Sequence, residues 1–99
     1  MAELTWSEQA VFDIERTLSD IERTSPAFAT VIGDEIRDVA DSLAVFPLLG
    51  AEVPEYGRPD IRERQVRSWR LIYRVDGEVI ELLTFVNVNR RLPRMPPGT

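Results

Sequence analysis

The chain has 99 residues, of which 43% are hydrophobic and 29% charged, which suits one soluble domain with a single modest core. It contains no cysteine and no histidine, which excludes disulfides, thiol nucleophiles, the commonest zinc ligand and the usual general base, so neither a metal nor a cofactor is expected. The formal net charge is −5, but residues 56–99 carry nine arginines and five acids, a net +4, whereas residues 1–55 carry −9. This division predicts a basic face on an acidic body.

The chain also contains no lysine, so every side-chain cation is a guanidinium, which suits bidentate contacts with carboxylate or phosphate. The first six residues lack the basic and apolar regions of a signal peptide. No apolar run is long enough to span a bilayer. We therefore expect a cytoplasmic protein without a membrane partner.

The N-terminal half predicts a short strand followed by two helices. Residues 3–6 alternate weakly, and Ser7 can cap a helix that ends near Arg23. Ser25 and Pro26 mark a second helix start, and Pro47 ends that helix. Apolar residues recur at helical spacing in both segments. The short connection predicts an antiparallel helical hairpin.

The C-terminal half predicts a loop and three strands. Prolines and glycines at residues 47–60 indicate the loop, and a period of two then predicts strands at 61–67, 69–75 and 78–89. Asp76-Gly77 is a strong signal for a tight hairpin. Residues 92–99 are expected to form a flexible tail.

The predicted fold is therefore α+β, a single domain over residues 1–99 with the order β-α-α-β-β-β. An antiparallel sheet packs against the N-terminal helical hairpin. Trp69, Leu71 and Tyr73 should face the core, as should Trp6, whereas Tyr56 lies in a polar loop and should be exposed. The alternation places Arg70 and Arg74 on the opposite face of their strand. Arg62 and Arg64 share a face of the preceding strand, but the pattern does not fix its register against Arg70.

Several segments together resemble a known family. They are Leu4-Thr5-Trp6-Ser7-Glu8-Gln9-Ala10, Asp13-Ile14-Glu15, Leu43-Ala44-Val45-Phe46-Pro47, Pro54-Glu55-Tyr56-Gly57-Arg58, Ile61-Arg62-Glu63, Trp69-Arg70-Leu71-Ile72-Tyr73-Arg74-Val75 and Asn89-Arg90-Arg91-Leu92-Pro93. In this order and over nearly the whole chain, they resemble the RelE/ParE superfamily of bacterial type II toxins. The ParE-like branch fits better than the RelE-like branch, for the reason given below.

The resemblance implies a toxin neutralised in a hetero-oligomer by a co-expressed antitoxin, ParD-like or RelB-like, in a toxin-antitoxin system associated with plasmid stabilization. ParE-like members inhibit DNA gyrase. RelE-like members cut mRNA in the ribosomal A site, with the ribosome and its mRNA as partners. A relic that only binds antitoxin is a third reading.

The resemblance also implies roles for individual arginines. In a RelE-like nuclease, Arg70 and Arg91, or Arg90 in place of Arg91, would be catalytic residues at the scissile phosphate. Arg62 and Arg64 fall near a further pair of basic positions. The expected binding arginines are Arg62, Arg64, Arg70, Arg74, Arg90 and Arg91.

The proton-transfer chemistry of a nuclease is harder to place. RNA cleavage needs a base for the 2′-hydroxyl and an acid for the leaving oxygen. The chain has no lysine or histidine, and residues 92–99 lack the tyrosine of RelE-like enzymes. Glu63 or Glu81 could act as the base, but nothing in the sequence assigns the role to either. These absences favour the non-enzymatic, ParE-like reading. Exposed strand arginines also form ordinary cross-strand pairs with acids, of which Arg62–Glu81 and Arg74–Glu63 are candidates.

Overall fold

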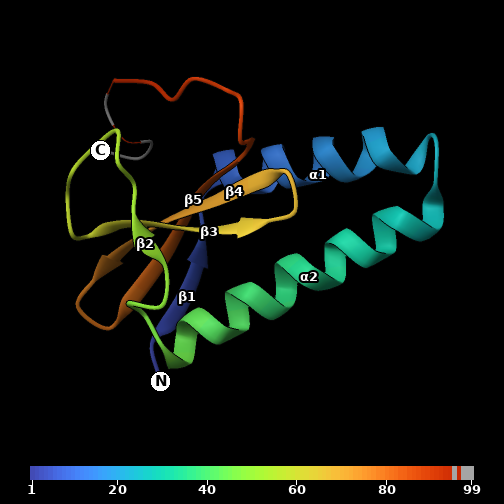
Figure 1. Ribbon diagram of the computed structural model, residues 1–99. Coiled ribbons are helices and arrows are strands. Elements are labelled where there is room, and N and C mark those ends of the chain that lie inside the picture. Colours follow the sequence, from blue (N-terminus) through green and yellow to red (C-terminus); the bar gives the residue numbers. More distant parts are fainter. Residues whose placement is uncertain (95, 97–99) are drawn as a thin grey trace.

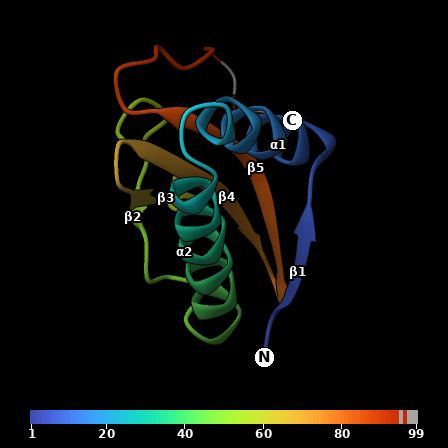
Figure 2. The same cartoon turned by 90° about the vertical axis from the view of Figure 1, so that its right-hand side faces the viewer.

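A computed structural model describes residues 1–94 and 96 and has the predicted order of elements, with one short additional strand (Figure 1). The elements are β1 (Glu3–Trp6), α1 (Glu8–Glu22), α2 (Pro26–Val45), β2 (Ala51–Glu52), β3 (Ile61–Val66), β4 (Trp69–Asp76) and β5 (Val79–Asn87). The strands form one sheet in the order β1-β5-β4-β3-β2. The connection between the two helices lies well beyond the sheet (Figure 1). Seen from that end, the helices lie in front of the sheet, between β1 and β2 (Figure 2).

Both helices begin where the sequence predicts. The Ser7 hydroxyl accepts a hydrogen bond from the Ala10 amide at 3.0 Å, and the Ser25 hydroxyl accepts one from the Phe28 amide at 3.2 Å. Pro26 occupies the first turn of α2, where its missing N–H leaves no hydrogen bond unmade. The predicted helical hairpin is confirmed.

The sheet is mixed rather than wholly antiparallel. Strands β3, β4 and β5 form the predicted antiparallel meander. Strand β1 runs parallel to β5, with Glu3 opposite Val79 and Trp6 opposite Leu82. Because β4 already occupies the inner edge of β5, the outer edge is the place where β1 can pair its backbone. Strand β2 falls inside the predicted loop and pairs with β3.

The core lies on both faces of the sheet. Between the sheet and the helices, Leu71 and Tyr73 are fully buried as predicted, and Trp69 stacks on Phe85 with ring centroids 5.9 Å apart. Trp6 was expected in this core but is 41% exposed. Its position at the end of β1, beside the hollow between the helices, leaves one side of the ring uncovered.

A smaller apolar cluster lies on the opposite face. Its buried members are Val53, Ile61, Ile72, Leu83 and Leu92. The Tyr56 ring packs against this cluster and its hydroxyl donates to the Pro93 carbonyl at 2.8 Å, so Tyr56 is half-buried rather than exposed. The first residues of the expected tail are therefore packed against the sheet. Residues 95 and 97–99, which also belong to that tail, lie outside the described residues.

Candidate functional site

The strand register divides the candidate arginines between the two faces of the sheet. Arg62 lies opposite Tyr73, and Arg64 lies opposite Leu71. Paired residues of antiparallel strands point to the same side, so these two arginines lie on the helix-covered face. Arg70 alternates with these residues and lies on the other face. The structure therefore does not gather all the strand arginines into one cluster.

Arg70 is enclosed by two carboxylates. Its Nε and one terminal nitrogen donate to Glu63 at 2.6 and 3.0 Å, and its two terminal nitrogens donate to Glu55 at 2.7 and 2.9 Å. The residue is only 8% exposed. The hydrogen bonds from Arg70 lower the pKa of Glu55, and the same contacts with Glu55 and Glu63 raise the pKa of Arg70.

This arrangement uses most of the hydrogen-bonding capacity of Arg70. A guanidinium has five N–H groups in one plane, and here both of its bidentate edges face a carboxylate. An incoming phosphate would have to displace Glu55 or Glu63. The ion pairs also connect β4 to β3 and to the loop between β2 and β3, which gives Arg70 a structural role.

Arg74 and Arg62 also have partners within the chain, whereas Arg64 keeps one nitrogen that no described residue satisfies. Arg74 pairs across the sheet with Glu81 at 2.5 Å, so a cross-strand pair of the predicted kind forms, but Glu81 has a different partner from the expected Arg62. Arg62 donates instead to the carbonyl oxygens of Pro59 and Gly50, both at 2.9 Å. The Nε atom of Arg64 is buried without a hydrogen-bond partner among the described residues.

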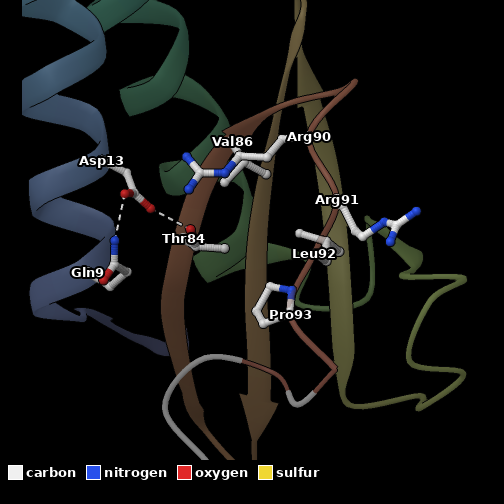
Figure 3. A pocket seen from close by; sticks show the side chains of 8 residues that line it. All are labelled: Gln9, Asp13, Thr84, Val86, Arg90, Arg91, Leu92 and Pro93. Atoms are coloured by element: carbon white, nitrogen blue, oxygen red, sulfur yellow. Dashed lines mark hydrogen bonds between the residues drawn. The ribbon is translucent and has the colours of Figure 1, made fainter.

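Arg90 and Arg91 differ from this group, because both are exposed beyond the end of β5. They line a cleft of about 630 Å³ that also includes Gln9, Asp13, Thr84, Val86, Leu92 and Pro93. Figure 3 shows the Arg90 side chain reaching toward α1, whereas Arg91 points away from that helix. Of the six predicted binding arginines, these two present their side chains most openly to solvent.

The acid in this cleft is already hydrogen-bonded. Asp13 accepts from Gln9 at 2.7 Å, from the Phe85 amide at 3.2 Å and, through a short contact, from the Thr84 hydroxyl (Figure 3). Three donors therefore surround the Asp13 carboxylate.

The segment after β5 is held by local contacts. The Asn87 side-chain oxygen accepts from the Asn89 amide at 2.9 Å, and the Asn87 carbonyl accepts from the Arg90 amide at 3.0 Å. Leu92 then anchors the chain in the smaller apolar cluster. The backbone at Arg90 and Arg91 thus has a defined position.

The sequence analysis did not identify Glu55 and Asp13 as site residues, and it named Glu63 only as a pairing candidate for Arg74 and, together with Glu81, as an unassigned candidate for a general base. For Glu63 a signal existed, because it alternates with Arg62 and Arg64 and so shares the face of Ile61. Glu55 is in a loop and Asp13 is on a helix, so neither position could be related to an arginine or a strand without the fold. Among the described residues, no group of three or more acids could hold a metal ion, and no helix is long and apolar enough to cross a membrane.

Comparisons with known proteins agree on one family. The family described as "ParE toxin of type II toxin-antitoxin system, parDE" matches residues 4–92. Toxin ParE3 of Caulobacter vibrioides is 29% identical over 76 residues, which cover 76% of this chain and 75% of that protein. A solved chain of the chromosomal ParDE TA system from P. aeruginosa shares the fold, with a TM-score of 0.74 and 22% identity over 90% of this chain and 98% of that one. The chain therefore belongs to the ParE toxin family of type II toxin-antitoxin systems.

Proposed function

We propose that this toxin acts by binding and inhibiting DNA gyrase, without hydrolytic chemistry, and that a cognate antitoxin of the ParD-like kind neutralises it in a hetero-oligomer. In this role it acts in the cytoplasm. Membership of the ParE toxin family supports the proposal. The observation that carries it is the enclosure of Arg70 by Glu55 and Glu63.

The alternative, a ribosome-dependent mRNA endonuclease, makes heavier demands on the site. Arg70 would have to exchange one of its two carboxylates for a phosphate, and that carboxylate would lose its two charge-assisted hydrogen bonds. A base and an acid would still be needed for the proton transfers. The sequence offers neither lysine nor histidine for these roles. Inhibition through binding needs none of this chemistry.

The helical hairpin offers a place for the apolar part of an antitoxin. A hollow of about 400 Å³ lies between the helices. Its apolar lining includes Trp6, Ile14, Leu18, Ala29 and Ile36, and its charged lining residues are Glu22, Asp34 and Arg37. An amphipathic segment of a partner could bury its apolar side there. This groove would supply hydrophobic contact area in the complex.

Purified toxin should inhibit DNA supercoiling by gyrase in a reconstituted assay, and equimolar antitoxin should restore it. The parallel measurement is translation on purified ribosomes, with the mRNA 5′ ends mapped. We expect intact transcripts there, because the chain has no lysine or histidine for the proton transfers and Arg70 is already paired with Glu55 and Glu63. Normal supercoiling together with new cuts in the ribosomal A site would overturn the proposal and establish the nuclease.

A further inference from the structure

Arg90 and Arg91, which follow β5, form a basic surface that could bind an acidic partner. Arg70, Arg74 and Arg67 all have carboxylate partners within the chain. Arg90 and Arg91 form no ion pair with any residue that the structure describes. Their charge is therefore available to a partner, in contrast to that of the strand arginines.

The cleft beside these arginines continues along α1. A second hollow of about 390 Å³ adjoins it, shares Gln9, Asp13, Val86 and Arg90 with it, and adds Arg16 to the lining. The two hollows together are lined by three arginines, Arg16, Arg90 and Arg91, and by two acids, Asp13 and Asp20. Asp13 accepts from three neutral donors, and Asp20 pairs with Arg23. Because the arginines outnumber the acids, the extended hollow is complementary in charge and length to an acidic peptide segment.

We propose that this cleft receives an acidic, extended segment of the antitoxin, with carboxylates paired to Arg90 and Arg91. The proposal deepens the neutralisation proposed above and rests on it. Apolar walls at Val86, Leu92 and Pro93 suit an apolar residue of the segment between its carboxylates. Because Leu92 and the Asn87 turn fix the backbone on either side of Arg90 and Arg91, this part of the chain does not have to be ordered when the partner binds.

Arg90 should contribute more than Arg91. Its side chain reaches over the cleft toward α1, and it lines both hollows, whereas Arg91 points away from the helix (Figure 3). A segment lying in the cleft therefore meets Arg90 along more of its length. Arg91 would meet a carboxylate only where the segment crosses residues 90–93.

The test measures binding of the antitoxin encoded beside this toxin gene to wild-type toxin and to Arg90→Glu and Arg91→Glu variants. We expect the dissociation constant to rise at least about tenfold for Arg90→Glu and less for Arg91→Glu, with the difference shrinking at high salt. Arg58→Glu is the matched control, because it makes the same charge change at an exposed arginine that already pairs with Asp60 on the loop after β2. Thermal unfolding of each variant checks that it is folded.

The possible results distinguish an error in the assignment of the cleft from an error in the proposed neutralisation by the antitoxin. If wild-type toxin binds the antitoxin but Arg90→Glu and Arg91→Glu bind as tightly as Arg58→Glu, the cleft assignment is wrong and neutralisation stands. If the two variants keep antitoxin affinity but lose inhibition of gyrase, the cleft belongs to the target, which also overturns the assignment. If wild-type toxin does not bind the antitoxin, the assignment of the cleft and the proposed neutralisation both fail.

Discussion

At Arg70, two carboxylates occupy the edges of the guanidinium that a phosphate would use. Glu63 is mostly buried, with 19% of its side chain exposed, whereas 42% of the Glu55 side chain is exposed. The two acids therefore differ in how strongly the solvent screens them. Glu55 is the member of the pair that can exchange its ion pair for water more easily.

The Glu55 contact should make stability depend on pH in the acid range. The pKa of Glu55 in the folded protein lies below its usual value of 4.5, because Arg70 donates hydrogen bonds to the carboxylate. The Glu55 carboxylate therefore contributes its full share to the free energy of unfolding at pH values above its pKa in the unfolded chain. This contribution is lost as the pH falls through its lower pKa in the folded protein. Glu55→Gln should lower the free energy of unfolding by about 1 kcal/mol near neutral pH.

This difference between Glu55→Gln and wild type should shrink toward zero as the pH falls below 4.5 and through the lowered pKa of Glu55 in the folded protein, because the wild-type carboxyl then takes up its proton. Urea unfolding of both proteins across this range measures it. Glu52→Gln is a control, because Glu52 is an exposed acid of the neighbouring strand β2. A constant difference at all pH values would show that the contact of Glu55 with Arg70 does not depend on the charge of Glu55.

Among the elements, α1 completes the outer edge of β5. Strand β1 pairs with β5 only as far as Leu82. Beyond that point the Ser7 hydroxyl donates to the Leu83 carbonyl at 2.8 Å, and the Asp13 carboxylate accepts from the Phe85 amide. Side chains of the helix and its cap therefore take the place of a neighbouring strand.

Replacement of Asp13 by alanine should release this edge. The Phe85 amide and the buried Thr84 hydroxyl would lose their acceptor, so we expect the free energy of unfolding to fall by about 2 kcal/mol. Amide hydrogen exchange at Phe85 should accelerate in the variant. Gln9→Ala serves as control, because it removes only an exposed partner of Asp13 and should cost less than about 0.5 kcal/mol. Equal stability of Asp13→Ala and wild type would refute this role.

The sequence predicted the elements that carry strong local signals. Ser7, Ser25 and Pro26 mark helix starts through short-range chemistry, and the strands from Ile61 onward carry a period of two. The sequence analysis did not predict β2, because a strand of two residues is too short to show an alternation of polar and apolar side chains. The direction of β1 depends on contacts with the far end of the chain, which local pattern does not contain.

The candidate site was predictable in composition but not in arrangement. Which face an arginine occupies depends on strand register, and the partner of Arg70 from the loop, Glu55, depends on how residues 53–60 cross the sheet. The sequence analysis named Arg90 and Arg91 as candidate binding residues, and the structure finds both exposed. Their cleft could not be foreseen, because α1 supplies Gln9 and Asp13 from the other end of the chain.

At the scale of the whole molecule, the turn after α2 exposes an unusual amount of apolar surface. Val45, Phe46, Leu48 and Leu49 are between 43% and 64% exposed. The turn is nevertheless fixed, because the buried Tyr73 hydroxyl donates to the Pro47 carbonyl and accepts from the Gly50 amide, both at 2.9 Å. Fixed and exposed apolar groups favour self-association of the isolated protein.

The double variant Phe46→Ser/Leu48→Ser should therefore remain soluble at higher concentration than wild type. Both side chains are more than 60% exposed, so we expect the free energy of unfolding to change by no more than about 0.5 kcal/mol. Light scattering against concentration measures the first effect, and urea unfolding measures the second. Unchanged scattering would show that the turn does not drive self-association.

The parallel pairing of β1 with β5 also sets when the sheet can be completed during synthesis. Glu3 pairs with Val79 and Trp6 with Leu82, so the first strand waits for the last strand before it has a neighbour. Contacts this distant in the sequence are slow to form, because the long intervening chain must first be ordered. Until the final hairpin has left the ribosome, β1 lacks its partner strand and α1 lacks the edge that Asp13 covers. A nascent chain therefore cannot complete its sheet until β5 has been synthesised and released.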